Sequence, residues 1–213
     1  MLLAMMNHNV NTGGGSGLSA PDSTSTSLLE RVKAQDAEAW GRFTQIYSPL
    51  VYSWCRRFGL AAEDTGDVTQ EVFRAVYSGV GRFRSDRPGD TFRGWLWTIT
   101  RNKIRDHARA HQGQAEAQGG TEAQQRLQEI PDTPPDDSGS PNSSTARIAH
   151  RALELMKVDF AERTWRAFWQ TAVEDRPPAE VAEAMGMSVD AVYQAKSRVL
   201  GRLRQELAGL DGD

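Results

Sequence analysis

The aromatic residues of this 213-residue chain fall into two blocks, and this separation most constrains how the chain can fold. The tryptophans lie at 40, 54, 95 and 97 in the first block and at 165 and 169 in the second. Residues 1–27 and 113–147 contain no aromatic residue; the first segment is rich in Gly, Ser, Thr and Asn, and the second in Pro, Gly, Ser and Asp. Such segments bury too little apolar surface to offset chain entropy. The sequence therefore predicts a disordered extension at 1–27, a flexible acidic linker at 113–147, and two small folded domains at 28–112 and 148–213.

The net charge of −3 hides an uneven distribution of charge along the chain. Residues 28–112 carry 14 basic and 10 acidic side chains, a net charge of +4, whereas residues 113–147 carry 2 basic and 6 acidic side chains. A binding partner responds to local charge rather than to the total. The positive charge of residues 28–112 is therefore compatible with nucleic-acid binding by the first domain.

Several classes of protein are disfavoured. The single cysteine, Cys55, excludes an internal disulfide framework, and its place in an apolar repeat predicts a buried structural thiol rather than a redox sensor. No apolar run approaches the roughly 18–20 residues that cross a bilayer, and the N-terminus lacks a basic signal region, so we expect a cytoplasmic protein without membrane insertion. Because the four histidines are scattered, we expect no metal site, cofactor, small-molecule substrate or catalytic residue, and no enzymatic activity.

The folded blocks show helical spacing only, and the sequence predicts an all-α protein. Apolar residues recur every three or four positions over 28–58, with Asp36 as an N-cap, a break at Ser48-Pro49 and a stop at Gly59. The Gly and Pro content of residues 79–91 predicts a loop. Further helices are predicted over 62–78, from Thr91 to about 110, from Ser144 or Thr145 to about 157, and over 162–174, 178–185 and 189–207.

The last two predicted helices form a helix-turn-helix pattern. A small residue, Ala182, allows the helices to cross closely, Gly186 supplies the positive φ of the turn, and Ser188 caps the second helix. The second helix carries polar and basic side chains that can reach bases and phosphates in a major groove. The alternative is an ordinary helical hairpin with a solvated basic face.

Two segments of the first domain carry further functional signals. Residues 92–110 combine an apolar face, which predicts core packing for Trp95 and leaves Trp97 between faces, with a polar and basic face. Residues 64–74 place acidic and amide side chains on one helical face, which suggests a second partner that is not DNA. Solvated helix faces are the alternative for both segments.

Taken in order, these pieces resemble RNA polymerase sigma factors of the extracytoplasmic-function group. Four stretches carry the resemblance: AWGRFTQIYSPLVYSWCRRFG, DVTQEVF, FRGWLWTITRNKIRDHAR and the C-terminal helix-turn-helix. The resemblance implies a protein that binds core RNA polymerase, recognises promoter DNA and stabilises strand opening, with an anti-sigma protein as a further possible partner. It implies that 28–112 is sigma region two and that 148–213 is sigma region four.

The resemblance also implies roles for matching residues. Core-polymerase contacts fall on Asp67, Gln70, Glu71 and Phe73. By the same resemblance, the minus-ten promoter element is contacted by a loop that holds a flipped base and by the helix that follows this loop. The implied contact residues are Phe83, Arg84, Ser85, Asp86, Arg101, Asn102, Arg105 and Arg109. The residues implied to contact the minus-thirty-five promoter element are Ser188, Asp190, Tyr193, Gln194, Lys196, Ser197 and Arg198.

Two departures from the family pattern and two rival functions accompany this interpretation. Thr65-Gly66 predicts a late start or a kink in its helix, and Tyr193 stands where a basic residue is common, which leaves the bases read there open. The two rival functions are a stand-alone helix-turn-helix regulator and a helical adaptor that binds only protein. Each of them would leave part of the sequence pattern unexplained.

Overall fold

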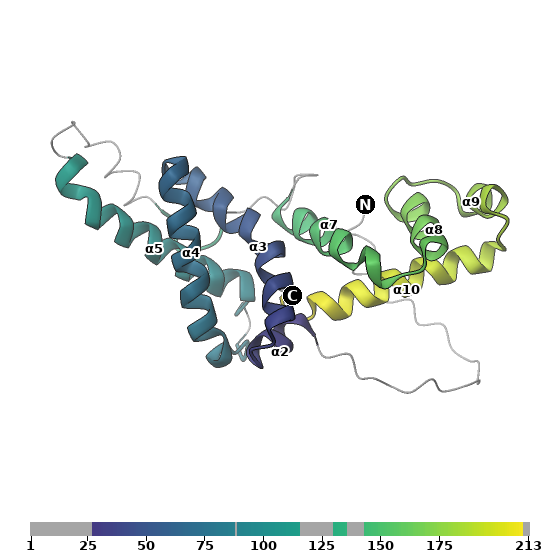
Figure 1. Cartoon of the computed structure of the whole chain (residues 1–213), viewed down its shortest axis with the longest axis horizontal. Coiled ribbons are helices and arrows are strands. Elements are labelled where there is room, and N and C mark those ends of the chain that lie inside the picture. Colours follow the sequence, from purple (N-terminus) through teal and green to yellow (C-terminus); the bar gives the residue numbers. More distant parts are fainter. Residues whose placement is uncertain (1–26, 88, 116–129, 136–142, 211–213) are drawn as a thin grey trace. The chain divides into compact units, whose positions relative to one another are not determined.

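A computed structural model of the chain describes residues 27–87, 89–115, 130–135 and 143–210 (Figure 1). Every regular element within these ranges is helical, which confirms the all-α prediction. The chain forms two compact units, one within residues 29–140 and the other within 141–208. The predicted N-terminal extension, apart from Ser27, and most of the predicted linker lie outside the described residues.

Within its described residues, the first unit contains five helical elements. They are α2 (Leu28–Lys33), α3 (Ala37–Arg57), α4 (Ala62–Gly79), the short 3-10 helix η1 (Val80–Arg82) and α5 (Phe92–Ala115). Helix α4 packs against both α3 and α5. Rings from all three helices meet around Phe43, whose centroid lies 5.8 Å from that of Phe73 and 5.6 Å from that of Phe92. This aromatic core fixes the faces that α4 and α5 leave exposed.

Local polar contacts set the ends of these helices largely as the sequence predicts. The Asp36 carboxylate accepts a hydrogen bond from the Ala39 N–H at 2.9 Å and caps α3. The helix ends before Gly59, which takes a φ of +94°. The Thr91 hydroxyl accepts from the Gly94 N–H at 3.0 Å at the start of α5. Helix α5 continues to Ala115, beyond the predicted end near 110.

Two predicted interruptions are wrong. Helix α3 runs unbroken through Pro49, although an internal proline costs about 3 kcal/mol. Its neighbours on both sides, including Tyr47 and Leu50, are buried, so tertiary packing outweighs that cost. Helix α4 begins at Ala62, so Thr65-Gly66 does not delay its start. Thr65 is fully buried, and its hydroxyl donates to the Ala61 carbonyl at 2.7 Å.

The second unit is a helical bundle around the C-terminal helix. It contains α7 (Ser144–Met156), the 3-10 helix η3 (Lys157–Asp159), α8 (Glu162–Ala172), α9 (Pro178–Met185) and α10 (Val189–Leu207). Helix α10 packs against α7, α8 and α9. The cap of α7 is Ser143, whose hydroxyl accepts from the Ala146 N–H at 3.2 Å, and not Ser144 or Thr145 as predicted. Ser144 is instead buried as the first helical residue.

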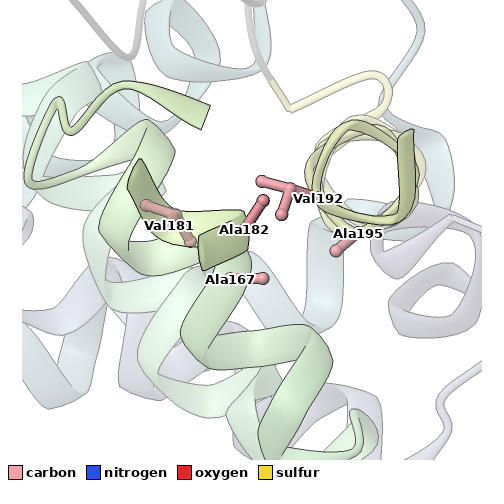
Figure 2. Packing of buried hydrophobic residues seen from close by; sticks show 5 residues of the cluster. All are labelled: Ala167, Val181, Ala182, Val192 and Ala195. Atoms are coloured by element: carbon pink, nitrogen blue, oxygen red, sulfur yellow. The ribbon is translucent and has the colours of Figure 1, made fainter. Parts of the chain in front are cut away.

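The joint between α9 and α10 has the predicted construction (Figure 2). Val181 and Ala182 of α9 pack with Val192 and Ala195 of α10, over Ala167 of α8. Gly186 takes a φ of +58°, and the Met187 N–H donates to the Ala182 carbonyl at 2.9 Å, a bond typical of the Schellman turn. The turn therefore depends on a small residue at the crossing and on a glycine at the helix end.

Candidate functional site

The predicted polymerase-contact residues on α4 divide between surface and core. Asp67 and Gln70 are exposed, and Glu71 is half-buried. Phe73 is only 8% exposed, and its ring packs edge-on against Phe43 and Trp40. Phe73 therefore supports the helix from inside and is not available for direct contact in this conformation.

Ion pairs link the polar face of α4 to α5. The Glu71 carboxylate pairs with Arg74 on its own helix and with the Lys103 ammonium of α5 at 3.5 Å. The His107 imidazole of α5 lies 3.5 Å from the Asp64 carboxylate of α4. The two helices thus present an acidic and a basic face side by side, joined at their shared edge.

The loop before α5 presents polar side chains and withdraws its aromatic one. Arg84, Ser85 and Asp86 are exposed. Phe83 is 6% exposed, with its ring centroid 5.4 Å from that of Phe92 and the Lys33 ammonium 5.3 Å from its ring. The prediction that Phe83 faces a flipped base is therefore not met by this arrangement, because the ring belongs to the core.

Both tryptophans of α5 pack against the core, but Trp97, which the sequence left between faces, is the more deeply buried of the two. Trp97 is fully buried, with its ring centroid 5.2 Å from that of Trp54. Trp95 is half-buried and packs on Phe83 and Phe92. The apolar periodicity of α5 did not reveal this, since part of the cover over Trp97 comes from residues distant in sequence.

The predicted DNA-contact residues of α5 share the polar side of the helix with unequal exposure. Asn102 and Arg109 are exposed, and Arg109 pairs with Asp106 at 3.3 Å. Arg101 and Arg105 are half-buried because they hold the segment Ile130–Pro135, which the sequence assigned to a flexible linker. The only signal for this contact was a lone apolar residue, Ile130, beside a proline-rich stretch.

Helix α10 presents the predicted recognition face to the outside. Ser188, Asp190, Gln194, Ser197 and Arg198 are exposed, Lys196 is half-buried and Tyr193 is 54% exposed. Between them, Val192, Ala195 and Val199 are buried. The Ser188 hydroxyl accepts from the Ala191 N–H at 3.1 Å, which commits its oxygen to the helix cap. Arg163 of α8 donates to the Met185 and Gly186 carbonyls and holds the turn in place.

Cys55 is a buried thiol in the described part of the chain. Burial raises the pKa of the Cys55 thiol to about 12, which keeps it protonated and unreactive. Among the residues that the structure describes, no group of three or more His, Cys, Asp and Glu side chains could hold a metal ion. No helix within the same residues is long and apolar enough to cross a membrane.

Comparison with known proteins relates this geometry to a family. The model of sigma-70 region 2 matches residues 43–114, which include most of α3, all of α4 and nearly all of α5. The chain is 29% identical over 192 residues to the RNA polymerase sigma factor CnrH of Cupriavidus metallidurans, a match that covers 89% of this chain and 95% of that protein. It is 35% identical over 95 residues to the ECF RNA polymerase sigma factor BldN of Streptomyces coelicolor, covering 44% of this chain and 34% of BldN. These matches support an RNA polymerase sigma factor of the extracytoplasmic-function group.

A solved structure of CnrH in complex with the cytosolic domain of CnrY is also similar, at 24% identity over 83% of this chain and 92% of that chain. Its TM-score of 0.35 is too low to support a shared arrangement of the domains. The role of this sigma factor in transcription initiation follows from the family matches. Helix-turn-helix DNA binding is typical of this family.

Proposed function

We propose that three separate exposed surfaces of this sigma factor divide the work of initiation. In this account residues 28–112 act as sigma region two and residues 148–213 as sigma region four, with 113–147 between them. The protein acts in the cytoplasm, where it meets core RNA polymerase and promoter DNA. An anti-sigma partner rests on the family resemblance alone, and we assign no residue to it.

The first surface, on α4, binds core polymerase through Asp67, Gln70 and Glu71. Its support is that Asp67 and Gln70 are exposed while the opposite side of the helix, at Val68 and Val72, is buried. The Glu71 contact with Lys103 gives this surface a fixed edge against α5. Phe73 contributes by keeping the helix in register with the aromatic core rather than by touching the polymerase.

The second surface binds the minus-ten element. It consists of the exposed loop residues Arg84, Ser85 and Asp86 together with Arg101, Asn102, Arg105 and Arg109 of α5. The observation that carries the proposal is that guanidinium and amide donors line one side of α5, while Leu96 and Ile104 on its other side are fully buried. A helix anchored in this way can offer donors to phosphates and base edges without moving.

The third surface, on α10, reads the minus-thirty-five element in duplex DNA. Asp190, Tyr193, Gln194, Ser197 and Arg198 project outward from a helix whose inner face is packed. Tyr193 gives this face an aromatic side chain with a hydroxyl, which favours contact with a thymine methyl group or a phosphate over a bidentate contact with guanine. Ser188 and Lys196 complete this surface, and Ser188 also caps the N-terminus of α10.

Paired variants separate the polymerase and DNA surfaces. Asp67→Ala with Gln70→Ala is expected to lower affinity for core polymerase by about tenfold, since both side chains are exposed and removing them does not disturb the core. Arg105→Ala with Asn102→Ala is expected to retain core binding and to lose promoter opening. Core affinity is measured by fluorescence anisotropy of the labelled sigma factor, and opening by permanganate reactivity of promoter thymines.

Glu63→Ala serves as the matched control, because Glu63 is exposed on the first turn of α4 and lies outside the proposed surfaces. It should behave as wild type in both assays. Equal core affinity of wild type and the Asp67/Gln70 variant would contradict the assignment of α4. Normal opening by the Asn102/Arg105 variant would contradict the assignment of α5.

A further inference from the structure

Residues Ile130–Pro135, which we call the strap, lie against α5 in a way that the proposed function does not use. Ile130 is 3% exposed and Pro135 is buried, whereas the residues 131–133 between them are exposed. The strap is thus anchored at both ends and open in the middle. Three of its six residues are prolines, which lack an N–H group, so its backbone offers mainly hydrogen-bond acceptors.

Four side chains at four-residue steps along α5 bind the strap. The Arg105 guanidinium donates to the Ile130 carbonyl at 3.2 Å, and the Trp97 indole N–H donates to the Pro131 carbonyl at 3.1 Å. The Arg93 guanidinium donates to the Pro135 carbonyl at 3.0 Å. Between these contacts, Arg101 forms an ion pair with the Asp132 carboxylate. Residues 93, 97, 101 and 105 form one continuous row of donors.

The strap offers these donors the same chemistry as a nucleic-acid backbone. Carbonyl oxygens and one carboxylate are acceptors with net negative charge, as phosphodiester oxygens are, and guanidinium groups bind both. Arg101 and Arg105 belong to the surface proposed for the minus-ten strand, so this step rests on the proposed function. A guanidinium N–H that donates to the strap is not available to a phosphate.

We propose that the strap is an internal competitor of single-stranded DNA for α5. The Asp132 side chain is 90% exposed, so its ion pair with Arg101 is weak and readily exchanged. Asn102 and Arg109 are exposed beside the strap and give an incoming strand its first contacts. The strand then takes over Arg101 and Arg105 as the strap leaves them. The strap lowers the affinity of the free protein for single strands.

The test measures the affinity of the full chain for a fluorescein-labelled, mixed-sequence oligonucleotide of about 12 nucleotides by anisotropy. Asp132→Asn removes the ion pair with Arg101, and Ile130→Ala loosens the buried anchor without changing charge. Each is expected to bind about threefold more tightly than wild type, the scale of one exposed ion pair. Glu63→Gln is the matched control, since it removes one negative charge from the same unit but lies outside the strap and the proposed DNA surface.

The mobility of a nitroxide label on Thr133→Cys provides an independent readout, because Cys55 is buried and does not take up the label. Saturating oligonucleotide should raise this mobility as the strap leaves α5. Equal affinities for wild type and both strap variants, or an equal gain from Glu63→Gln, would overturn the competition and leave a strap that only completes the core. If Arg101→Ala with Arg105→Ala does not lower affinity, the proposed role of α5 in strand binding fails as well, and the two failures are thus distinguishable.

Discussion

At the scale of single residues, Asp36 shows how one carboxylate determines where a helix begins. Its oxygens accept from the Ala39 N–H at 2.9 Å and from the Arg31 guanidinium at 3.1 Å. These contacts favour the ionised form, and they lower the pKa of Asp36 below the ordinary value of an aspartate, with the Ala39 hydrogen bond as the main cause and Arg31 next. The charge on Asp36 therefore adds to the stability of the first unit.

This shift predicts a pH-dependent difference between wild type and Asp36→Asn. Because the folded pKa lies below the unfolded one, the stabilisation is fully present above the unfolded pKa and is lost as the pH falls through the folded value. Asparagine keeps the cap but not the charge. Thermal unfolding followed by circular dichroism should show wild type as the more stable protein at pH 7, and this difference should shrink as the pH falls through the folded pKa of Asp36. A difference that persists unchanged at low pH would contradict this assignment.

Other residues show how far sequence reasoning reaches. Asp36, Thr91 and Ser188 are helix caps as predicted, because capping depends on residues within one turn. The environments of Trp95 and Phe83 could not be predicted in the same way, since their burial depends on rings brought together from α3, α4 and α5. Contacts between helices also explain why the expectation that a proline interrupts a helix was wrong at Pro49.

At the scale of elements, the turn between α9 and α10 depends on the backbone of one glycine. Gly186 has a φ of +58°, and a Cβ added there would meet nothing within 4 Å. The penalty for a side chain is therefore conformational and not steric. Gly201, within α10, also has open space around it but no positive φ. The two glycines form a natural pair for comparison within one unit.

Gly186→Ala is expected to destabilise the second unit by about 1–2 kcal/mol, because alanine is strained in the left-handed region. Gly201→Ala is expected to stabilise the same unit by about 0.5–1 kcal/mol, because alanine favours a helix interior. Urea denaturation followed by circular dichroism measures both changes. Equal effects of the two substitutions would show that the turn does not need its glycine conformation.

The elements themselves were largely predictable, and their surfaces less so. The bounds of α9 and α10 agree with the predicted 178–185 and 189–207 because Pro178, Gly186 and Ser188 are strong local signals. The outward face of α10 follows from the same periodicity. The polar face of α5 was predicted too, but its occupation by the strap was not, since Arg105 and Ile130 are separated by 25 residues.

At the scale of the whole molecule, the two units carry different kinds of surface on separate cores. The unit within 29–140 combines an acidic face on α4 with a basic face on α5, and the unit within 141–208 exposes a helix-turn-helix. A stand-alone regulator would need only the second of these. A sigma factor uses all of them, because it must bind polymerase and DNA at once.

The most direct test of this account is run-off transcription with cognate core polymerase and a pooled promoter library, with and without the purified protein. The account predicts protein-dependent transcripts whose templates share two upstream elements, one near minus ten and one near minus thirty-five. The Asn102/Arg105 variant should bind core polymerase and yield no such transcripts. Absence of protein-dependent transcripts, together with tight sequence-specific DNA binding by the protein alone, would contradict the account and indicate a helix-turn-helix regulator.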